Sequence, residues 1–130
     1  MSEPGTEYRA WLVKADEDRL CVRNEMNAVQ KPWSVICFHC QQAAEKYLKA
    51  FLVQRGVRPE RTHDLAQLVA ACIQVDTSLS ALRAPCVKLS DFAVDVRYPG
   101  VPVDVEEQMA REAIEVAELI CSTIRKKLPA

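Results

Sequence analysis

Residues 38–50, Phe-His-Cys-Gln-Gln-Ala-Ala-Glu-Lys-Tyr-Leu-Lys-Ala, decide the fold that we expect for this chain. Alanine, leucine, glutamine, glutamate and lysine dominate the segment, and all of them favour helix. Pro32 precedes it at a position suited to the first turn of a helix, where the missing N–H of proline costs nothing. Gly56 follows it at a position suited to the helix end, where a left-handed residue is common. We therefore predict one helix over residues 32–55.

Two rows of side chains run along this predicted helix. The first row recurs at three- and four-residue spacing and predicts the face turned to the core. Its members are Cys37, Phe38, Gln41, Ala44, Leu48, Phe51 and Leu52. The second row follows one flank of the helix and consists of Val35, His39, Gln42, Lys46, Lys49 and Val53.

The imidazole, amide and ammonium groups of the second row offer hydrogen-bond donors and positive charge. Such a set suits an anion, a phosphate or the edge of a base. The alternative interpretation is an ordinary solvated flank, since charged helix faces usually serve only to contact water. In that case Glu45 and Lys49 would form a simple i, i+4 ion pair.

Length and charge limit the possible functions. At 130 residues the chain fits one domain that can bury a core of its own. Its 17 basic and 18 acidic residues nearly cancel, so any anion site must be local and not part of a global basic field. No apolar run approaches the ~20 residues that span a membrane, and the N-terminus does not read as a secretory signal. We predict a cytoplasmic protein.

The six cysteines fall mostly on apolar faces of predicted helices. Without an export signal, reduced thiols that pack as small apolar side chains are the simpler interpretation. Cys37 and Cys40 form a C-x-x-C pattern, but it lies inside a helix and no second pair accompanies it. We therefore predict no metal site and no cofactor.

Helical patterns continue through the rest of the chain. We expect residues 1–6 to be disordered, residues 7–128 to form the domain, and a first helix to cover about residues 7–28. Asp64 begins a short helix, with Gln67 completing a capping-box pattern. Another helical segment follows at about residues 79–94, where Pro85 predicts a kink or a split.

Asp104 and Glu107 form a second capping box at the start of a last helix, which runs to about Lys127. No segment alternates apolar and polar residues with the period of a strand. We therefore predict an all-α fold, an up-and-down four-helix bundle with one additional short helix.

Several of these segments together resemble the HEPN domain. They are residues 38–50, Trp11-x3-Ala15, Thr62-His63-Asp64-Leu65 and Arg97-Tyr98-Pro99. They come in the family's order and span about residues 8–125. The resemblance implies a helical bundle that commonly pairs as a homodimer and binds nucleotide or RNA. It also implies, for many members, a small nucleotidyltransferase partner in a toxin–antitoxin or accessory role. Other members are metal-independent ribonucleases.

Nuclease members carry an arginine, four to six residues and then a histidine, near the start of the last long helix. Arg97 occupies the corresponding position here, but no histidine follows His63 anywhere in the chain. The incomplete motif argues against an enzyme. Arg58 and His63 match the spacing numerically, yet they precede the third helix, so we interpret the match as coincidence.

We predict a nucleotide- or anion-binding site and no catalytic residues. The site residues are His39, Gln42, Lys46, Lys49, His63, Asp64, Arg97 and Tyr98. Structural roles remain open for three of them. His63 would hydrogen-bond the first turn of its helix, Tyr98 would be a core aromatic, and Arg97 would pair with Glu45 or Asp95.

The predicted function is a nucleotide- or RNA-phosphate-binding module that acts as a dimer with a minimal nucleotidyltransferase partner. One alternative is a metal-independent ribonuclease with a variant active site, in which His39 or His63 is the base. Another is a purely structural dimer that buries apolar surface.

Overall fold

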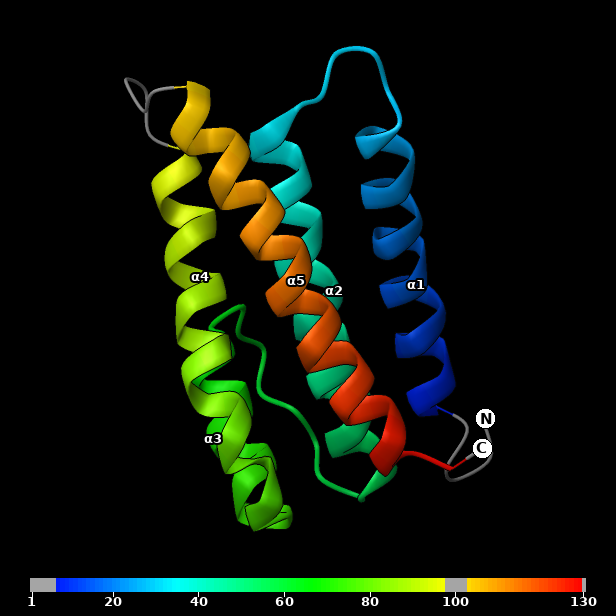
Figure 1. Ribbon diagram of the computed structural model, residues 1–130. Helices are drawn as coiled ribbons and strands as arrows, with labels where there is room; N and C mark the ends of the chain where they lie inside the picture. The colour runs from blue at the N-terminus through cyan, green and yellow to red at the C-terminus, as the bar shows by residue number, and fades with distance from the viewer. Residues whose placement is uncertain (1–6, 98–102, 130) are drawn as a thin grey trace.

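The computed structural model describes the backbone of residues 7–97 and 103–129, and the side chains of residues 7–92 and 106–129. The elements in chain order are α1 (Glu7–Met26), α2 (Trp33–Gln54), α3 (Leu65–Val75), the 3-10 helix η1 (Thr77–Leu82), α4 (Arg83–Arg97) and α5 (Val103–Lys127). The four long helices α1, α2, α4 and α5 run up and down, and the short α3 lies beside them (Figure 1). The described residues contain no strand. The predicted all-α bundle is confirmed.

Helix α2 lies at the centre of the bundle and packs against α1, α3, α4 and α5. Its small residues Ala43, Ala44 and Ala50 are almost fully buried, so neighbouring helices can approach it closely. The apolar row predicted for this helix is buried from Cys37 to Leu52, with two exceptions. Gln41 is half-buried, and Phe38, which we placed on the core face, is 40% exposed.

The ends of α2 follow the predicted signals. The helix begins one residue after Pro32 and ends just before Arg55. Gly56 has φ +78°, the left-handed conformation for which glycine was expected. The Val57 N–H donates to Leu52 O at 2.8 Å and the Gly56 N–H donates to Val53 O at 3.0 Å. This bond pair is the Schellman motif, which satisfies carbonyls that the helix leaves free.

Asp64 caps α3 as predicted, because its carboxylate accepts from the Ala66 N–H at 2.9 Å. The predicted break near Pro85 occurs at the junction of η1 and α4, between Leu82 and Arg83. Pro85 is the third residue of α4, where its missing N–H would have no partner within the helix.

Helix α5 begins at Val103, so Asp104 falls inside its first turn and not at the predicted capping position. All six cysteines are free thiols. Five of them are buried, and Cys21 is half-buried, which confirms the packing role predicted for most of them.

Candidate anion-binding cleft

Two residues of the predicted flank, His39 and Lys46, meet at a carboxylate of α1. His39 Nδ1 lies 2.9 Å from Asp18 Oδ1, and Lys46 Nζ donates to Asp18 Oδ2 at 2.6 Å. Glu25 is also close, with Oε1 at 3.8 Å from His39 Nε2. Asp18 itself is only 8% exposed. The positive charge of this part of the flank is therefore balanced by carboxylates of α1.

Sequence reasoning missed Asp18 because it stands in a run of four charged residues, 16–19, that looks solvated. One signal could have found it. Asp18 lies three residues after Ala15 and four before Val22, both buried, so helical spacing places it on the inward face of α1.

Lys49 and His63 meet at Glu45. Lys49 Nζ donates to Glu45 Oε2 at 3.1 Å, and His63 Nδ1 lies 2.8 Å from Glu45 Oε1. The predicted Glu45–Lys49 ion pair is confirmed, but the solvated setting is wrong, since Glu45 is 2% and Lys49 7% exposed. Gln41 Nε2 also donates to the His63 carbonyl at 3.4 Å. The loop before α3 is thereby fastened to α2.

The other predicted site residues take different positions. Gln42 is half-buried on α2, and Asp64 is exposed at the start of α3. Arg97 is the last residue of α4, which ends where α2 begins, at the opposite end of the bundle from the end of α2 (Figure 1). The side chain of Arg97 and the whole of Tyr98 lie outside the described residues, as does the side chain of Asp95. The roles predicted for them stay predictions.

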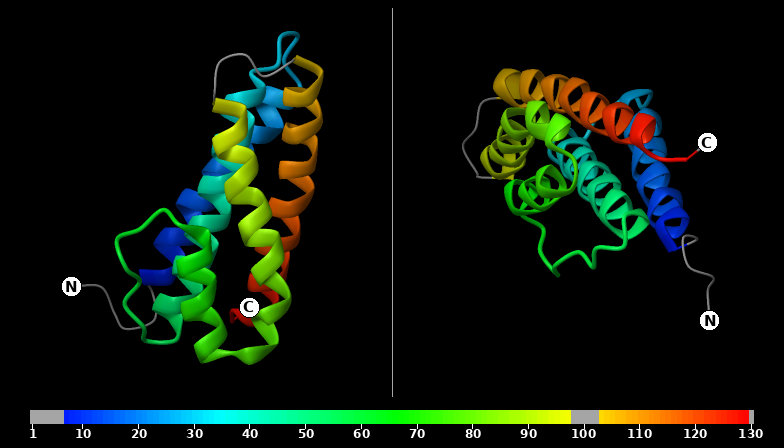
Figure 2. Two further views of the ribbon diagram at one scale, coloured as in Figure 1. Left: turned by 90° about the vertical axis from the view of Figure 1, so that its left-hand side faces the viewer. Right: turned by 90° about the horizontal axis from the view of Figure 1, so that it is seen from below.

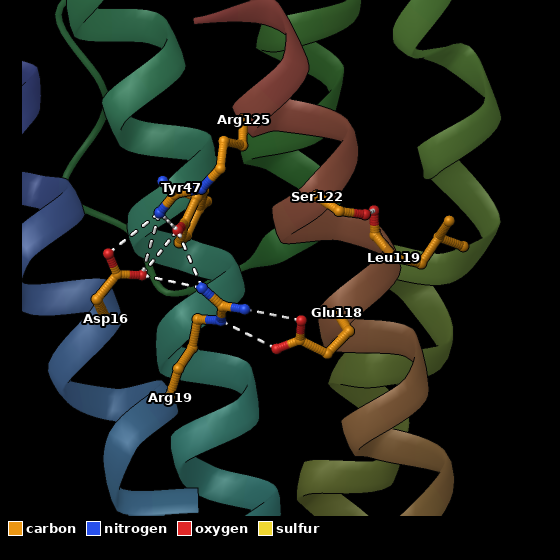
Figure 3. A network of polar contacts seen from close by, with 7 residues as sticks. All are labelled: Asp16, Arg19, Tyr47, Glu118, Leu119, Ser122 and Arg125. Carbon is orange, nitrogen blue, oxygen red and sulfur yellow. Dashed lines mark hydrogen bonds and ion pairs between the residues drawn. The ribbon is translucent and has the colours of Figure 1, made fainter. Parts of the chain in front are cut away.

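A polar network centred on Tyr47 joins α1, α2 and α5 (Figure 3). The buried Tyr47 hydroxyl donates to Asp16 Oδ1 at 2.7 Å and accepts from Arg125. Arg19 forms two hydrogen bonds with Glu118, at 2.9 and 2.8 Å. Burial raises the pKa of Tyr47. Burial opposes ionisation of Asp16 too, but hydrogen bonds from Tyr47 and Arg19 leave its pKa lowered. The cations of this network are paired within it. The network therefore holds α1, α2 and α5 together.

An open cleft of about 690 Å³ lies between the start of α1 and the loop that follows α2. Its lining residues are Glu7, Trp11, Lys49, Val53, Gly56, Val57, Arg58, Pro59, Glu60 and Arg61. Lys49 Nζ lies 5.3 Å from the centroid of the Trp11 ring. Three cations, Lys49, Arg58 and Arg61, thus line the same cleft as the Trp11 ring.

Arg58 and Arg61 are both exposed, and neither forms an ion pair with an acidic side chain among those that the structure describes. Their guanidinium groups are therefore available to bind phosphate, for which their forked donors are well suited. Neither arginine is among the site residues predicted from sequence, because both lie in a loop outside the helical rows on which that prediction was based. The available signal was the presence of three arginines and one histidine in the nine residues from Arg55 to His63.

The chain matches the family model of the HEPN domain over residues 8–127, and it therefore belongs to this family. No curated protein and no solved structure matches it. Family membership supports a nucleotide- or RNA-related module, and HEPN domains commonly dimerise. Within residues 7–97 and 103–129, no helix is long and apolar enough to cross a bilayer.

Proposed function

We propose that this HEPN protein binds the phosphate groups of a nucleotide or RNA, as a dimer that works with a nucleotidyltransferase partner. The observation that carries the proposal is the cleft in which Arg58 and Arg61 face a ligand-sized space of about 690 Å³. Because the whole chain has a net charge of −1, attraction of an anion depends on such a local group of cations.

The cleft offers contacts for each part of a nucleotide. The two arginines would bind phosphate oxygens. Trp11 would stack against a base, an interaction that tolerates any base because every base has a flat face. The Glu60 carboxylate would accept hydrogen bonds from ribose hydroxyls.

Among the predicted site residues whose side chains are described, the cleft shares only Lys49. His39 and Lys46 already bind Asp18, so an incoming phosphate would have to compete with a carboxylate at 2.6–2.9 Å from them. Lys49 is likewise held by Glu45, and it contributes positive charge to the cleft wall without leaving that pair. The exposed arginines are therefore the principal anion ligands.

Titration calorimetry with ADP and with a short single-stranded RNA tests the site. Arg58→Ala combined with Arg61→Ala should weaken binding by about tenfold or more, since a charge-assisted hydrogen bond contributes ~1.5–3 kcal/mol. Affinity should also fall as salt rises. Arg83→Ala removes an exposed arginine outside the cleft and is the matched control. Unchanged affinity in the double variant would overturn the proposed site.

Dimerisation and the partner need separate measurements. Sedimentation equilibrium at micromolar concentration should give twice the mass of the 14.6 kDa chain. A purified minimal nucleotidyltransferase should co-elute with the protein in size-exclusion chromatography. If the protein is a monomer and does not bind the nucleotidyltransferase, the proposed dimer and partner are excluded. The proposed anion-binding cleft would still stand.

A second candidate function, metal-independent RNA cleavage, is favoured by the setting of His63. Its Nδ1–H donates to the buried Glu45 carboxylate, which fixes the tautomer and leaves Nε2 on a side chain that is 79% exposed. A histidine oriented in this way can take a proton from a ribose hydroxyl. RNA incubated with the protein in EDTA should then be cut, and His63→Ala should abolish cutting while His39→Ala does not. Intact RNA would exclude this candidate.

A further inference from the structure

A second cleft, of about 410 Å³, lies on the other side of the loop between α2 and α3. Its lining residues are Leu52, Val57, Arg58, Pro59, Glu60, Thr62, Gln67, Leu68, Ala70, Ala71 and Gln74. Residues 57–60 line both clefts. This stretch of loop is therefore a wall that separates the two clefts, and Arg58 is its one basic residue.

The loop bows away from the helices between its two attachments (Figure 2). At its start, the Val57 N–H donates to Leu52 O at 2.8 Å. At its end, His63 binds Glu45 through its ring and accepts from Gln41 through its carbonyl. The arrangement leaves the stretch around Arg58 as an exposed crest with a cleft on each side.

The two clefts differ in chemistry. The first is lined by three cations and two carboxylates. The second shares Arg58 and Glu60 with it but adds the amides of Gln67 and Gln74 and apolar side chains such as Leu68. Gln67 and Gln74 are both exposed and lie seven residues apart on α3, which places them on the same face of that helix. Amide side chains pair with the edges of bases, and apolar surface accepts the flat face of a base.

We infer that the ligand is a single-stranded oligonucleotide that crosses the loop and occupies both clefts. This inference rests on the proposed function and names its ligand class. The phosphates of one end bind Arg61 in the first cleft, where Lys49 adds positive charge from the wall. A base at the other end pairs with Gln67 and Gln74, and Arg58 binds the phosphate that joins the two parts. A mononucleotide fills only one cleft.

Binding of AMP and of single-stranded oligoadenylates from two to eight nucleotides tests the inference by fluorescence anisotropy or calorimetry. Affinity should rise at least ~10-fold from AMP to the tetramer, because one more stacked or paired base adds about that factor. Affinity should change little beyond the tetramer. The same affinity for AMP and for every oligomer would overturn the inference while leaving the proposed function standing. No binding of any of them would instead remove the proposed function.

Variants separate the second cleft from simple charge attraction. Gln67→Ala combined with Gln74→Ala should lower the affinity for the tetramer to near that for AMP and leave AMP binding unchanged. Arg58→Ala should weaken both ligands. Gln108→Ala removes an exposed glutamine of α5 and is the matched control. A length dependence that persists in the Gln67/Gln74 variant would overturn the role of the second cleft.

Discussion

Replacing Glu45 by glutamine tests how strongly one buried carboxylate holds the bundle. Glu45→Gln keeps the size of the side chain but removes the charge that pairs with Lys49 at 3.1 Å and with His63 at 2.8 Å. The side chain of Lys49 is only 8% exposed, so its ammonium would remain buried without a counter-charge. Removing one partner of such a pair costs about 3–5 kcal/mol.

The lower end of that range applies here. Lys49 lines an open cleft and lies 5.3 Å from the centroid of the Trp11 ring, so it keeps one favourable contact and a route toward water. We therefore expect a loss of about 3 kcal/mol in the free energy of unfolding. In urea, with a slope of about 2 kcal/mol/M, the midpoint should fall by ~1.5 M.

Urea unfolding followed by far-ultraviolet circular dichroism measures this loss. Glu17→Gln is the matched control, because Glu17 is 61% exposed and its oxygen lies 3.7 Å from Lys14. The control should lose less than about 0.5 kcal/mol. The double variant Glu45→Gln/Lys49→Met should recover most of the lost stability, since it removes both buried charges. A midpoint for Glu45→Gln that matches the Glu17→Gln midpoint would refute the reasoning.

Three further predictions concern local features. Gly56→Ala should cost about 1 kcal/mol in thermal unfolding, because φ is +78° there while the space for a Cβ is open; an unchanged melting temperature would contradict this. The pKa of Asp76 is lowered to about 2 by hydrogen bonds from Ser78 and Lys127, so its contribution to stability is present above pH ~4 and lost as pH falls toward 2. Asp76→Asn should therefore reduce the dependence of the melting temperature on pH between pH ~4 and pH ~2. Burial raises the pKa of Cys37 to about 11, so iodoacetamide at pH 8 should alkylate the half-buried Cys21 first, as mass spectrometry of digests would show.

Local signals in the sequence predicted the helices well because each signal acts over a few residues. The boundaries of α2 follow from Pro32 and Gly56, and the start of α3 follows from Asp64. The predicted break near Pro85 was displaced by three residues, because proline fits the first turn of a helix without disrupting it.

The site was harder to predict because it depends on which side chains meet across helices. Periodicity along one helix placed His39, Lys46 and Lys49 on one flank. It could not show that the first two bind Asp18 while Lys49 binds Glu45. Arg58 is absent from the predicted site for a different reason. It lies in a loop without periodicity, and only the folded chain shows that the loop separates two clefts.

The central position of α2 has a consequence for synthesis of the protein on the ribosome. Three of the four helices that pack against α2 are synthesised after it, namely α3, α4 and α5, and the last of these spans 25 residues. A nascent chain that holds α2 without α5 lacks the helix that packs along α2 and carries Arg125, the partner of the Tyr47 hydroxyl. We therefore expect the native bundle to assemble only after α5 has left the ribosome, with chaperones able to bind the chain until then.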